Sequence, residues 1–179
     1  SAYQRLFVEL TGRDTFLSGD NFDPPSLDWP SARGYTKEQT SAVWEAIKKD
    51  DEFWVNLPPI NHNVGSLRLM LPMLDAKHDV YYITSRLGLD AKRQTEVWLE
   101  ETLGYVNLDV HPTTLIVGHR VKGLVAKSLN LDAYIDDNLD NVNDCVRDSP
   151  TTRTYLLNRR YNPGPDIGFT WVRSLGAMF

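Results

Sequence analysis

Two short stretches decide the fold: Val80-Tyr-Tyr-Ile-Thr-Ser-Arg86 and Ala133-Tyr-Ile-Asp-Asp137. Each is a run of strand-forming apolar residues that breaks abruptly into polar side chains. The first run ends in two hydroxyls, Thr84 and Ser85, and the second ends in two adjacent carboxylates. Because sites in parallel α/β sheets form at the carboxyl ends of strands, these side chains are the first candidates for a functional site.

Around these stretches the sequence alternates between strand and helix patterns. Periodicity predicts strands over about 79–84, 113–117, 132–135 and a last one over 153–157, and helices over about 63–76, 90–103, 121–129 and 139–147. Strands that alternate with helices are typical of a parallel sheet covered by helices on both faces. The predicted fold class is therefore α/β. We expect Asp90 to cap the second of these helices.

The first part of the chain follows a different pattern. Residues 1–12 have the spacing of an amphipathic helix, and Thr36 is typical of a helix N-cap. Segment 17–58 is rich in turn residues and aromatics and lies outside the alternation. We therefore expect a small helical cap over 17–58 and a core formed by 1–16 and 59–179.

The composition is that of an ordinary globular protein. The chain has 179 residues, a formal net charge of −5 and one cysteine, Cys145, which we expect to be buried. The acidic charge disfavours nucleic acid as a partner, and a single cysteine excludes an internal disulfide. No apolar run approaches the ~20 residues that span a bilayer. These features predict a cytoplasmic protein without a membrane partner, and a homodimer is left open.

Asp136 and Asp137 are the candidate metal ligands. Adjacent carboxylates repel each other and suit a hard cation such as Mg²⁺, which takes one or two carboxylates and leaves room for phosphate oxygens. The alternative is a helix cap, in which Asp137 or Asn138 begins the helix over 139–147. Asp136 is favoured over Asp137 as the metal ligand.

Four further side chains suit a bound phosphate. A hydroxyl just past a strand, from Thr84 or Ser85, can contact a phosphoryl oxygen, and Arg86 offers a second contact. Ordinary capping of the loop is the alternative. Lys122 opens a predicted helix, where a cation is unfavourable with the helix dipole. Neutralising a phosphate and the nearby carboxylates would explain its position, and a solvated surface lysine is the competing interpretation.

Three other residues are weaker candidates for substrate contacts. His119 follows the predicted strand over 113–117, although an ordinary loop histidine is the favoured interpretation. Phe53 and Trp54 belong more often to a core, but in a cap they could stack on a nucleobase. No histidine or cysteine spacing resembles a zinc site, and the sequence contains no Walker loop.

These residues together resemble the haloacid dehalogenase-like (HAD) phosphatase superfamily, and most closely its 5'(3')-deoxyribonucleotidase-like group. Three motifs carry the resemblance: Tyr81-Tyr-Ile-Thr84, Lys122-Gly123 and Ile135-Asp-Asp137. Phe53-Trp-Val-Asn-Leu-Pro-Pro-Ile60 resembles the return from the family's cap, and Leu156-Leu-Asn-Arg-Arg-Tyr-Asn162 resembles its late strand and the loop that follows.

The resemblance implies a Rossmann-like core with a small helical cap. It implies Mg²⁺-dependent hydrolysis of a phosphate monoester, such as a nucleotide, through an aspartyl-phosphate. Thr84 would bind the transferring phosphoryl group, and Lys122 would neutralise it. Asp136, together with Asp137, would hold Mg²⁺.

One motif of that family is absent from the sequence. The family's first strand ends in Asp-x-Asp-Gly, supplies the nucleophile and would precede the helix near Ser1; Asp20 and Asp23 have the wrong spacing to replace it. We therefore expect the chain to be inactive alone. A longer form of the protein or a partner chain would supply the strand, or the protein is a non-catalytic phosphate-binding module. A phosphatase acting on nucleic-acid ends is a further alternative.

Overall fold

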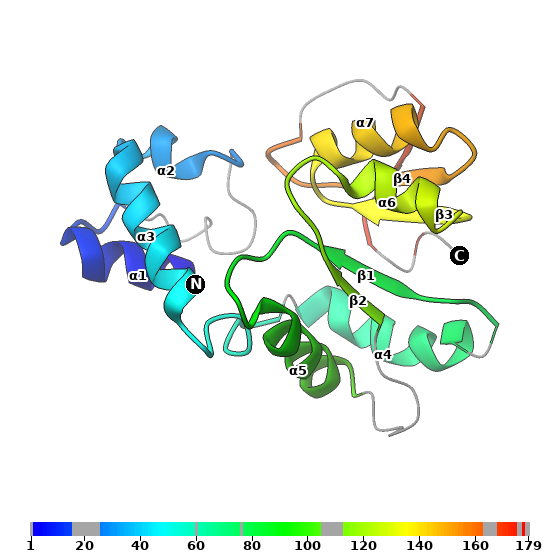
Figure 1. Ribbon diagram of the computed structural model, residues 1–179, viewed down its shortest axis with the longest axis horizontal. Helices are drawn as coiled ribbons and strands as arrows, with labels where there is room; N and C mark the ends of the chain where they lie inside the picture. The colour runs from blue at the N-terminus through cyan, green and yellow to red at the C-terminus, as the bar shows by residue number, and fades with distance from the viewer. Residues whose placement is uncertain are drawn as a thin grey trace.

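The computed structural model describes residues 2–15, 26–59, 61–75, 77–104, 113–162, 168–174 and 177. Helices and parallel strands alternate along most of the chain, which confirms the predicted α/β class (Figure 1). Among these residues, no helix combines the length and the apolar character needed to cross a membrane.

The described strands form two small parallel sheets. They are β1 (Tyr81–Thr84), β2 (Thr113–Ile116), β3 (Ala133–Asp136), β4 (Arg153–Leu157) and β5 (Thr170–Val172). β1 pairs with β2, and the second sheet has the order β3-β4-β5. The expected single sheet is therefore present as two separate parts in the described residues. The prediction that 153–157 is the last strand is wrong, because the three-residue β5 follows and pairs with β4.

The helices agree closely with the sequence pattern. They are α1 (Ala2–Thr11), α2 (Trp29–Ala32), α3 (Lys37–Lys49), α4 (Asn61–Asp75), α5 (Ala91–Leu103), α6 (Lys122–Ser128) and α7 (Leu139–Asp148). Thr36 caps α3 as predicted, in a capping box with Gln39. Asp90 occupies the N-cap position of α5 as predicted, but its side chain makes no capping hydrogen bond. Its carboxylate instead accepts a hydrogen bond from Arg93 Nε at 2.6 Å.

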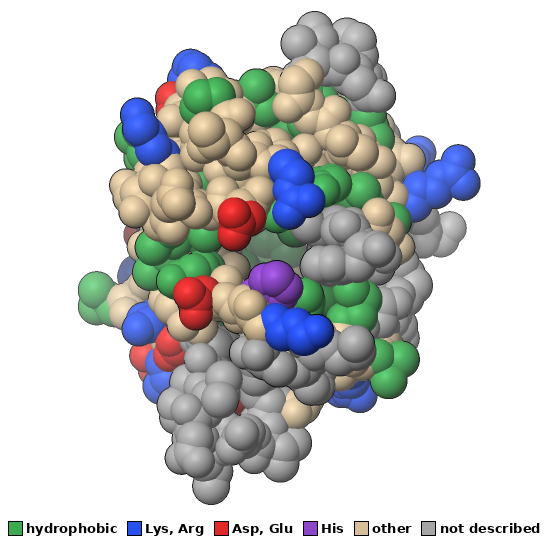
Figure 2. Space-filling view, turned by 90° about the vertical axis from the view of Figure 1, so that its right-hand side faces the viewer, with side chains coloured by type: hydrophobic (Ala, Val, Ile, Leu, Met, Phe, Trp, Pro, Cys, Tyr) green, Lys and Arg blue, Asp and Glu red, His purple; other side chains and the backbone are tan. Residues whose placement is uncertain are grey.

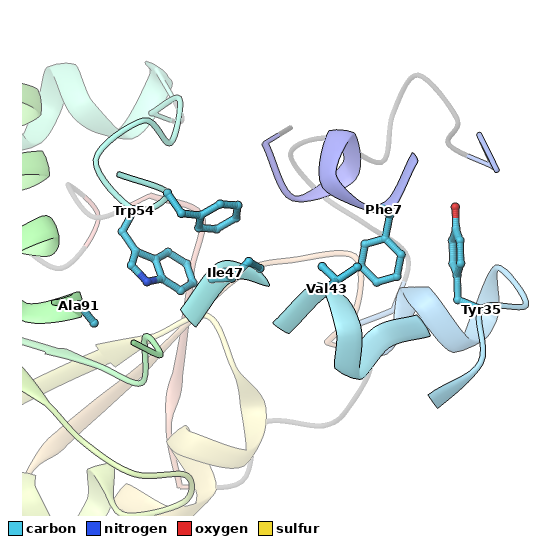
Figure 3. Packing of buried hydrophobic residues seen from close by; sticks show 7 residues of the cluster. Phe7, Tyr35, Val43, Ile47, Trp54 and Ala91 are labelled. Carbon is cyan, nitrogen blue, oxygen red and sulfur yellow. The ribbon is translucent and has the colours of Figure 1, made fainter. Parts of the chain in front are cut away.

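The three N-terminal helices share one apolar cluster. Phe7 of α1 and Val43 of α3 are fully buried, and Tyr35 packs against Phe7 with ring centroids 4.7 Å apart (Figure 3). The cluster continues through Ile47 to Trp54. α1, which we assigned to the core, thus packs with elements of the segment assigned to the cap. The division into core and cap stays a prediction.

Two further apolar clusters lie on the sides of β1. The first, which we call the α4–α5 cluster, is formed by Leu71, Leu99 and Leu103, and Tyr82 of β1 packs against it. The second, the α6–α7 cluster, is formed by Ala126, Tyr134 and Cys145, and Ile83 of β1 packs against it. Cys145 is free and fully buried, as predicted. β1 therefore presents successive side chains to two different clusters, as the two-residue period of a strand requires.

Gly123 allows α6 and α7 to pack unusually closely. A Cβ atom at this position would lie 2.9 Å from the backbone nitrogen of Cys145 and closer still to the carbonyl of Asp144. Both of these atoms belong to the backbone of α7, which cannot move aside as a side chain can. The contact matters for function because the neighbouring residue, Lys122, begins α6.

We expect Gly123→Ala to lower the free energy of unfolding by about 1–3 kcal/mol, because the added methyl group forces two helices apart. Gly65→Ala is the matched control: Gly65 lies in α4, and apart from that helix itself no atom lies within 4 Å of the position that its added methyl group would take. This control should raise stability by about 0.5–1 kcal/mol through its helix propensity. Urea unfolding of both variants tests the pair, and equal effects would contradict the close α6–α7 contact.

Candidate functional site

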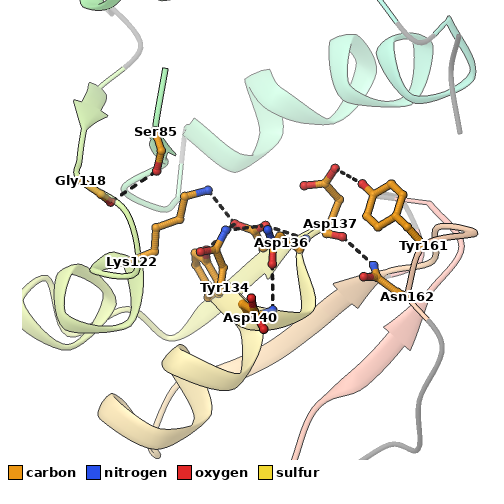
Figure 4. Close-up of polar contacts among 11 residues, drawn as sticks. Ser85, Gly118, Lys122, Tyr134, Asp136, Asp137, Asp140, Tyr161 and Asn162 are labelled. Carbon is orange, nitrogen blue, oxygen red and sulfur yellow. Dashed lines mark hydrogen bonds and ion pairs between the residues drawn. The ribbon is translucent and has the colours of Figure 1, made fainter. Parts of the chain in front are cut away.

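The carboxyl ends of β1, β2 and β3 meet in one polar region, as expected for a parallel α/β protein (Figure 4). Ser85 follows β1, and its hydroxyl donates to the carbonyl oxygen of Gly118, just after β2, at 3.5 Å. Lys122 reaches from the start of α6 to Asp136 at the end of β3, with 2.8 Å between Nζ and Oδ2. The structure thus brings Lys122, which the sequence analysis singled out, together with the carboxyl ends of β1, β2 and β3.

Asp136 is the centre of this region. Its side chain is only 5% exposed. Oδ2 accepts hydrogen bonds from Lys122 Nζ at 2.8 Å and from the Tyr134 hydroxyl at 2.6 Å. Oδ1 accepts from the backbone nitrogen of Asn138 at 2.8 Å and from Asn141 Nδ2 at 3.2 Å. A carboxylate offers about four acceptor positions, so Asp136 is fully satisfied by donors from β3, α6 and the start of α7.

The charge of Lys122 keeps Asp136 ionised. Burial of the carboxyl group raises its pKa, but the positive charge of Lys122 and the hydrogen bonds from Lys122 and Tyr134 outweigh burial and hold the pKa below its usual value. Burial beside this negative charge raises the pKa of the Tyr134 hydroxyl, so Tyr134 remains a donor. The Lys122 side chain is itself only 12% exposed. The pair is therefore a largely buried salt bridge, which is stable only while both partners and their hydrogen bonds are present.

Asp137 differs from its neighbour because it is less completely enclosed by donors. Its Oδ2 accepts a hydrogen bond from the Tyr161 hydroxyl at 2.5 Å, and its backbone oxygen accepts one from Asn162 Nδ2 at 2.6 Å. The cap of α7 is Asn138, whose side chain accepts from the backbone nitrogen of Asp140 at 2.8 Å. The capping alternative thus applies to Asn138, and it leaves the Asp137 carboxylate available to another partner.

Arg86 occupies an aromatic pocket at the end of β1. Its guanidinium carbon lies 5.2 Å from the ring centre of Trp54 and 5.5 Å from that of Trp98, and Nη1 donates to Thr95 Oγ1 at 3.1 Å. Burial lowers the pKa of Arg86 to about 10. The ion pairs found among the described residues include no carboxylate partner for this cation. Contact of Arg86 with a substrate phosphate stays a prediction.

The remaining candidates are placed less favourably. Thr84 is half-buried at the end of β1, and its backbone oxygen accepts from the nitrogen of Val117 at 2.9 Å. His119 is exposed in the turn before α6. Phe53 and Trp54 are 7% and 8% exposed and belong to the N-terminal apolar cluster. Their burial leaves little ring surface for a nucleobase, and the observed contact of Trp54 is with Arg86.

Sequence patterns alone missed four residues that complete the polar region. Tyr134 and Asn141 donate to Asp136, while Tyr161 and Asn162 donate to Asp137. Tyr134 could have been found from the sequence, because it lies two residues before Asp136 in the same strand, and residues two apart in a strand share one face. The other three come from a helix and a loop whose proximity to the strand end depends on tertiary packing.

The residues of the polar region fit a magnesium ion in their chemistry, although the carboxylate ligands are few. Among the described residues, no group of three or more His, Cys, Asp and Glu side chains is placed to hold a metal. Asp136 and Asp137 supply carboxylate oxygens, and Asn162 Oδ1 is a buried oxygen that lacks a hydrogen-bond donor. Mg²⁺ is typically bound by one or two carboxylates and several waters, so this set suffices if Asp136 releases one of its donors.

Comparisons with protein-family models, with curated proteins and with solved structures found no match. Any function assigned to the chain therefore rests on its own residues and on the geometry of the strand ends.

We expect Lys122→Met to raise the pKa of Asp136 above its value in the unmodified protein, because burial would no longer be opposed by a positive charge. In the unmodified protein the folded-state pKa is depressed, so the carboxylate stabilises the fold above about pH 4 and this contribution is lost as pH falls. In the variant the sign reverses if burial dominates: stability then falls as pH rises above about 4.

Carboxyl NMR titration of Asp136, together with urea unfolding at several pH values, measures both effects. Lys127→Met is the matched control, since Lys127 belongs to the same helix but makes no contact with Asp136. An Asp136 titration that is identical in the Lys122 variant and the unmodified protein would show that the ion pair does not control the carboxylate.

Proposed function

We propose that the chain is the body of a Mg²⁺-dependent phosphate monoester hydrolase of the HAD type, with a Rossmann-like core, a small helical cap and a nucleotide as the preferred substrate class. The observation that carries the proposal is the buried pair of Lys122 and Asp136, 2.8 Å apart beside the carboxylate of Asp137. A lysine and two carboxylates at one strand end, facing the hydroxyls of a second strand end, are suited to a phosphate and a divalent cation.

Each side chain has a role that follows from its position. Asp136 and Asp137 would hold Mg²⁺, which when bound would neutralise charge on the phosphoryl oxygens. Lys122 would place a second positive charge beside the same oxygens. The hydroxyls of Thr84 and Ser85 would donate hydrogen bonds to the phosphoryl group. Arg86, held by Trp54 and Trp98, is a further cation at the same edge.

The nucleophile in this proposal is an aspartate outside residues 1–179. The resemblance to HAD phosphatases implies an apolar strand that ends in Asp-x-Asp, and residues 1–179 contain no Asp-x-Asp sequence. This same observation favours the second candidate function, a non-catalytic protein that binds a phosphorylated small molecule. A cytoplasmic location and a homodimeric state stay predictions.

We expect Asp136→Asn and Asp137→Asn each to weaken Mg²⁺ binding to residues 1–179, because each removes one of the two carboxylates that the cation can use. Asp132→Asn is the matched control, since Asp132 lies just before the start of β3, at the opposite end of the strand. Isothermal titration with MgCl₂ measures the affinity. Equal Mg²⁺ affinity in all three variants would remove the metal assignment.

We also expect residues 1–179 to bind a deoxynucleoside monophosphate without hydrolysing it, because the nucleophile is missing. Titration calorimetry measures binding, and release of inorganic phosphate measures turnover. Lys122→Met should weaken nucleotide binding while Lys127→Met leaves it unchanged. Turnover that exceeds the Lys122→Met background would contradict the assignment of the nucleophile to another strand, and binding that does not depend on Lys122 would contradict the proposed site.

A further inference from the structure

The position of Lys122 depends on the turn that leads into α6. Residues 117–121 connect β2 to α6, and Lys122 is the first residue of that helix. Within the turn, Arg120 has a φ of 59°, in the left-handed region that residues with a Cβ atom rarely adopt. Val121, at the N-cap position, makes no side-chain capping bond. The conformation of the turn therefore needs support from another part of the fold.

Arg120 receives this support from an ion pair with Asp144 of α7. Its Nε donates to Oδ2 of Asp144 at 3.3 Å and its Nη2 donates to Oδ1 at 3.3 Å, so the guanidinium contacts both oxygens. Charged side chains on the face shown in Figure 2 stand out into solvent, whereas the side chain of Asp144 is only 1% exposed. Hydrogen bonding from Arg120 lowers the pKa of Asp144, which keeps the carboxylate ionised. Because a buried carboxylate without a counter-charge is strongly destabilising, the fold favours keeping this pair closed.

The same residue of α7 meets α6 again on the other side of Lys122. A Cβ atom on Gly123 would collide with the backbone carbonyl of Asp144, so the two helices approach each other at this point. Asp144 thus contacts Arg120 with its side chain and approaches Gly123 with its backbone. Lys122 lies between these two positions in the chain, so one residue of α7 holds the start of α6 on both sides of the lysine.

The ion pair of Lys122 with Asp136 requires an accurately placed start of α6. Both side chains are largely buried, and Nζ lies 2.8 Å from Oδ2. A buried salt bridge is stabilising only when its geometry is good, because the cost of removing two charges from water is otherwise not recovered. A displaced first turn of α6 would therefore weaken the contact between the two charges.

We propose that Arg120 is a positioning residue for Lys122. Its ion pair with Asp144 fixes the left-handed turn, and the turn directs the ammonium of Lys122 onto Asp136. Arg120 is not among the described donors to Asp136, so its effect passes through the backbone that precedes α6. The consequence for phosphate binding rests on the proposed function, in which Lys122 lies beside the phosphoryl oxygens. The positioning itself is a property of the chain without ligands.

Arg147 provides the matched control. It donates to the same carboxylate, with Nη1 2.6 Å from Oδ1 of Asp144, and its side chain is 60% exposed, compared with 54% for that of Arg120. Arg147 lies within α7, however, and has no part in the turn before α6. Loss of either arginine removes one counter-charge from Asp144, but only loss of Arg120 also frees the turn.

The test compares residues 1–179 without ligand with two variants. Arg120→Asn removes the guanidinium, and asparagine is among the residues that accept a left-handed backbone. Arg147→Gln removes the control guanidinium and keeps a good helix former in α7. Competitive acetylation followed by mass spectrometry measures the reactivity of the Lys122 ammonium group. Alkylation of the fully buried Cys145 measures general loosening of the α6–α7 cluster.

We expect Arg120→Asn to raise the acetylation rate of Lys122 at least about threefold, because a lysine that leaves its ion pair becomes accessible to the reagent. Arg147→Gln should leave this rate unchanged, and Cys145 should react at the same rate in all three proteins. The proposal would be overturned by an unchanged Lys122 rate in Arg120→Asn or by an equal rise in Arg147→Gln. A rise at Cys145 that matches the rise at Lys122 would also overturn it, because Arg120 would then stabilise the helix pair as a whole.

Nucleotide binding separates this proposal from the proposed function. If both are correct, Arg120→Asn weakens binding of a deoxynucleoside monophosphate, as Lys122→Met does. If Lys122 becomes reactive in Arg120→Asn but Lys122→Met binds the nucleotide normally, the proposed function fails and the positioning role stands. If the reactivity of Lys122 does not change, the positioning role fails whatever the result with the nucleotide.

Discussion

The structure depends most on the requirement that two charges removed from water must be satisfied together. Lys122 and Asp136 are both largely buried, and a buried ion without its partner is strongly destabilising. Three elements meet this requirement. β3 supplies Asp136 and Tyr134, α6 supplies Lys122, and the start of α7 supplies the donors of Asn138 and Asn141. The close approach of α6 to α7 at Gly123 serves the same requirement, because it brings the first residue of α6 within reach of the end of β3.

Arg86 extends this principle to the N-terminal part of the chain. A guanidinium between Trp54 and Trp98 combines a cation with two aromatic faces, an interaction that holds a charge at modest cost. Two hydrogen bonds fix the position of Trp54. Its backbone nitrogen donates to Gln94 Oε1 at 2.8 Å, and its ring nitrogen donates to the carbonyl of Leu87 at 2.8 Å. The segment that follows α3 is thereby joined to α5 and to the loop after β1. Trp54, which the sequence suggested for nucleobase stacking, instead positions the guanidinium of Arg86 beside the polar region.

The sequence predicted the strand ends well because each is marked twice, by an apolar run and by an abrupt change to polar residues. This double signal located Thr84 and Asp136, and the position of Lys122 against the helix dipole drew attention to it. β5 has only three residues, too few for a period to be recognised. Aspartate is a common helix-capping residue, but the carboxylate of Asp90 is engaged by Arg93 and makes no capping bond to the backbone of α5. Tyr161 and Asn162 reach Asp137 only because β4 lies beside β3, and pairing between strands distant in the sequence leaves no local pattern.

The arrangement around Asp136 makes anion and cation binding interdependent. The ammonium group of Lys122 is already engaged by Asp136 Oδ2. In the proposed function, a phosphate that attracts this ammonium would loosen its hold on the carboxylate and free an oxygen for a cation. A cation on that oxygen would conversely release the ammonium towards the phosphate. Such exchange produces positive heterotropic cooperativity, which thermodynamic reciprocity makes equal in both directions. One shared lysine would then ensure that the two ligands are taken up together.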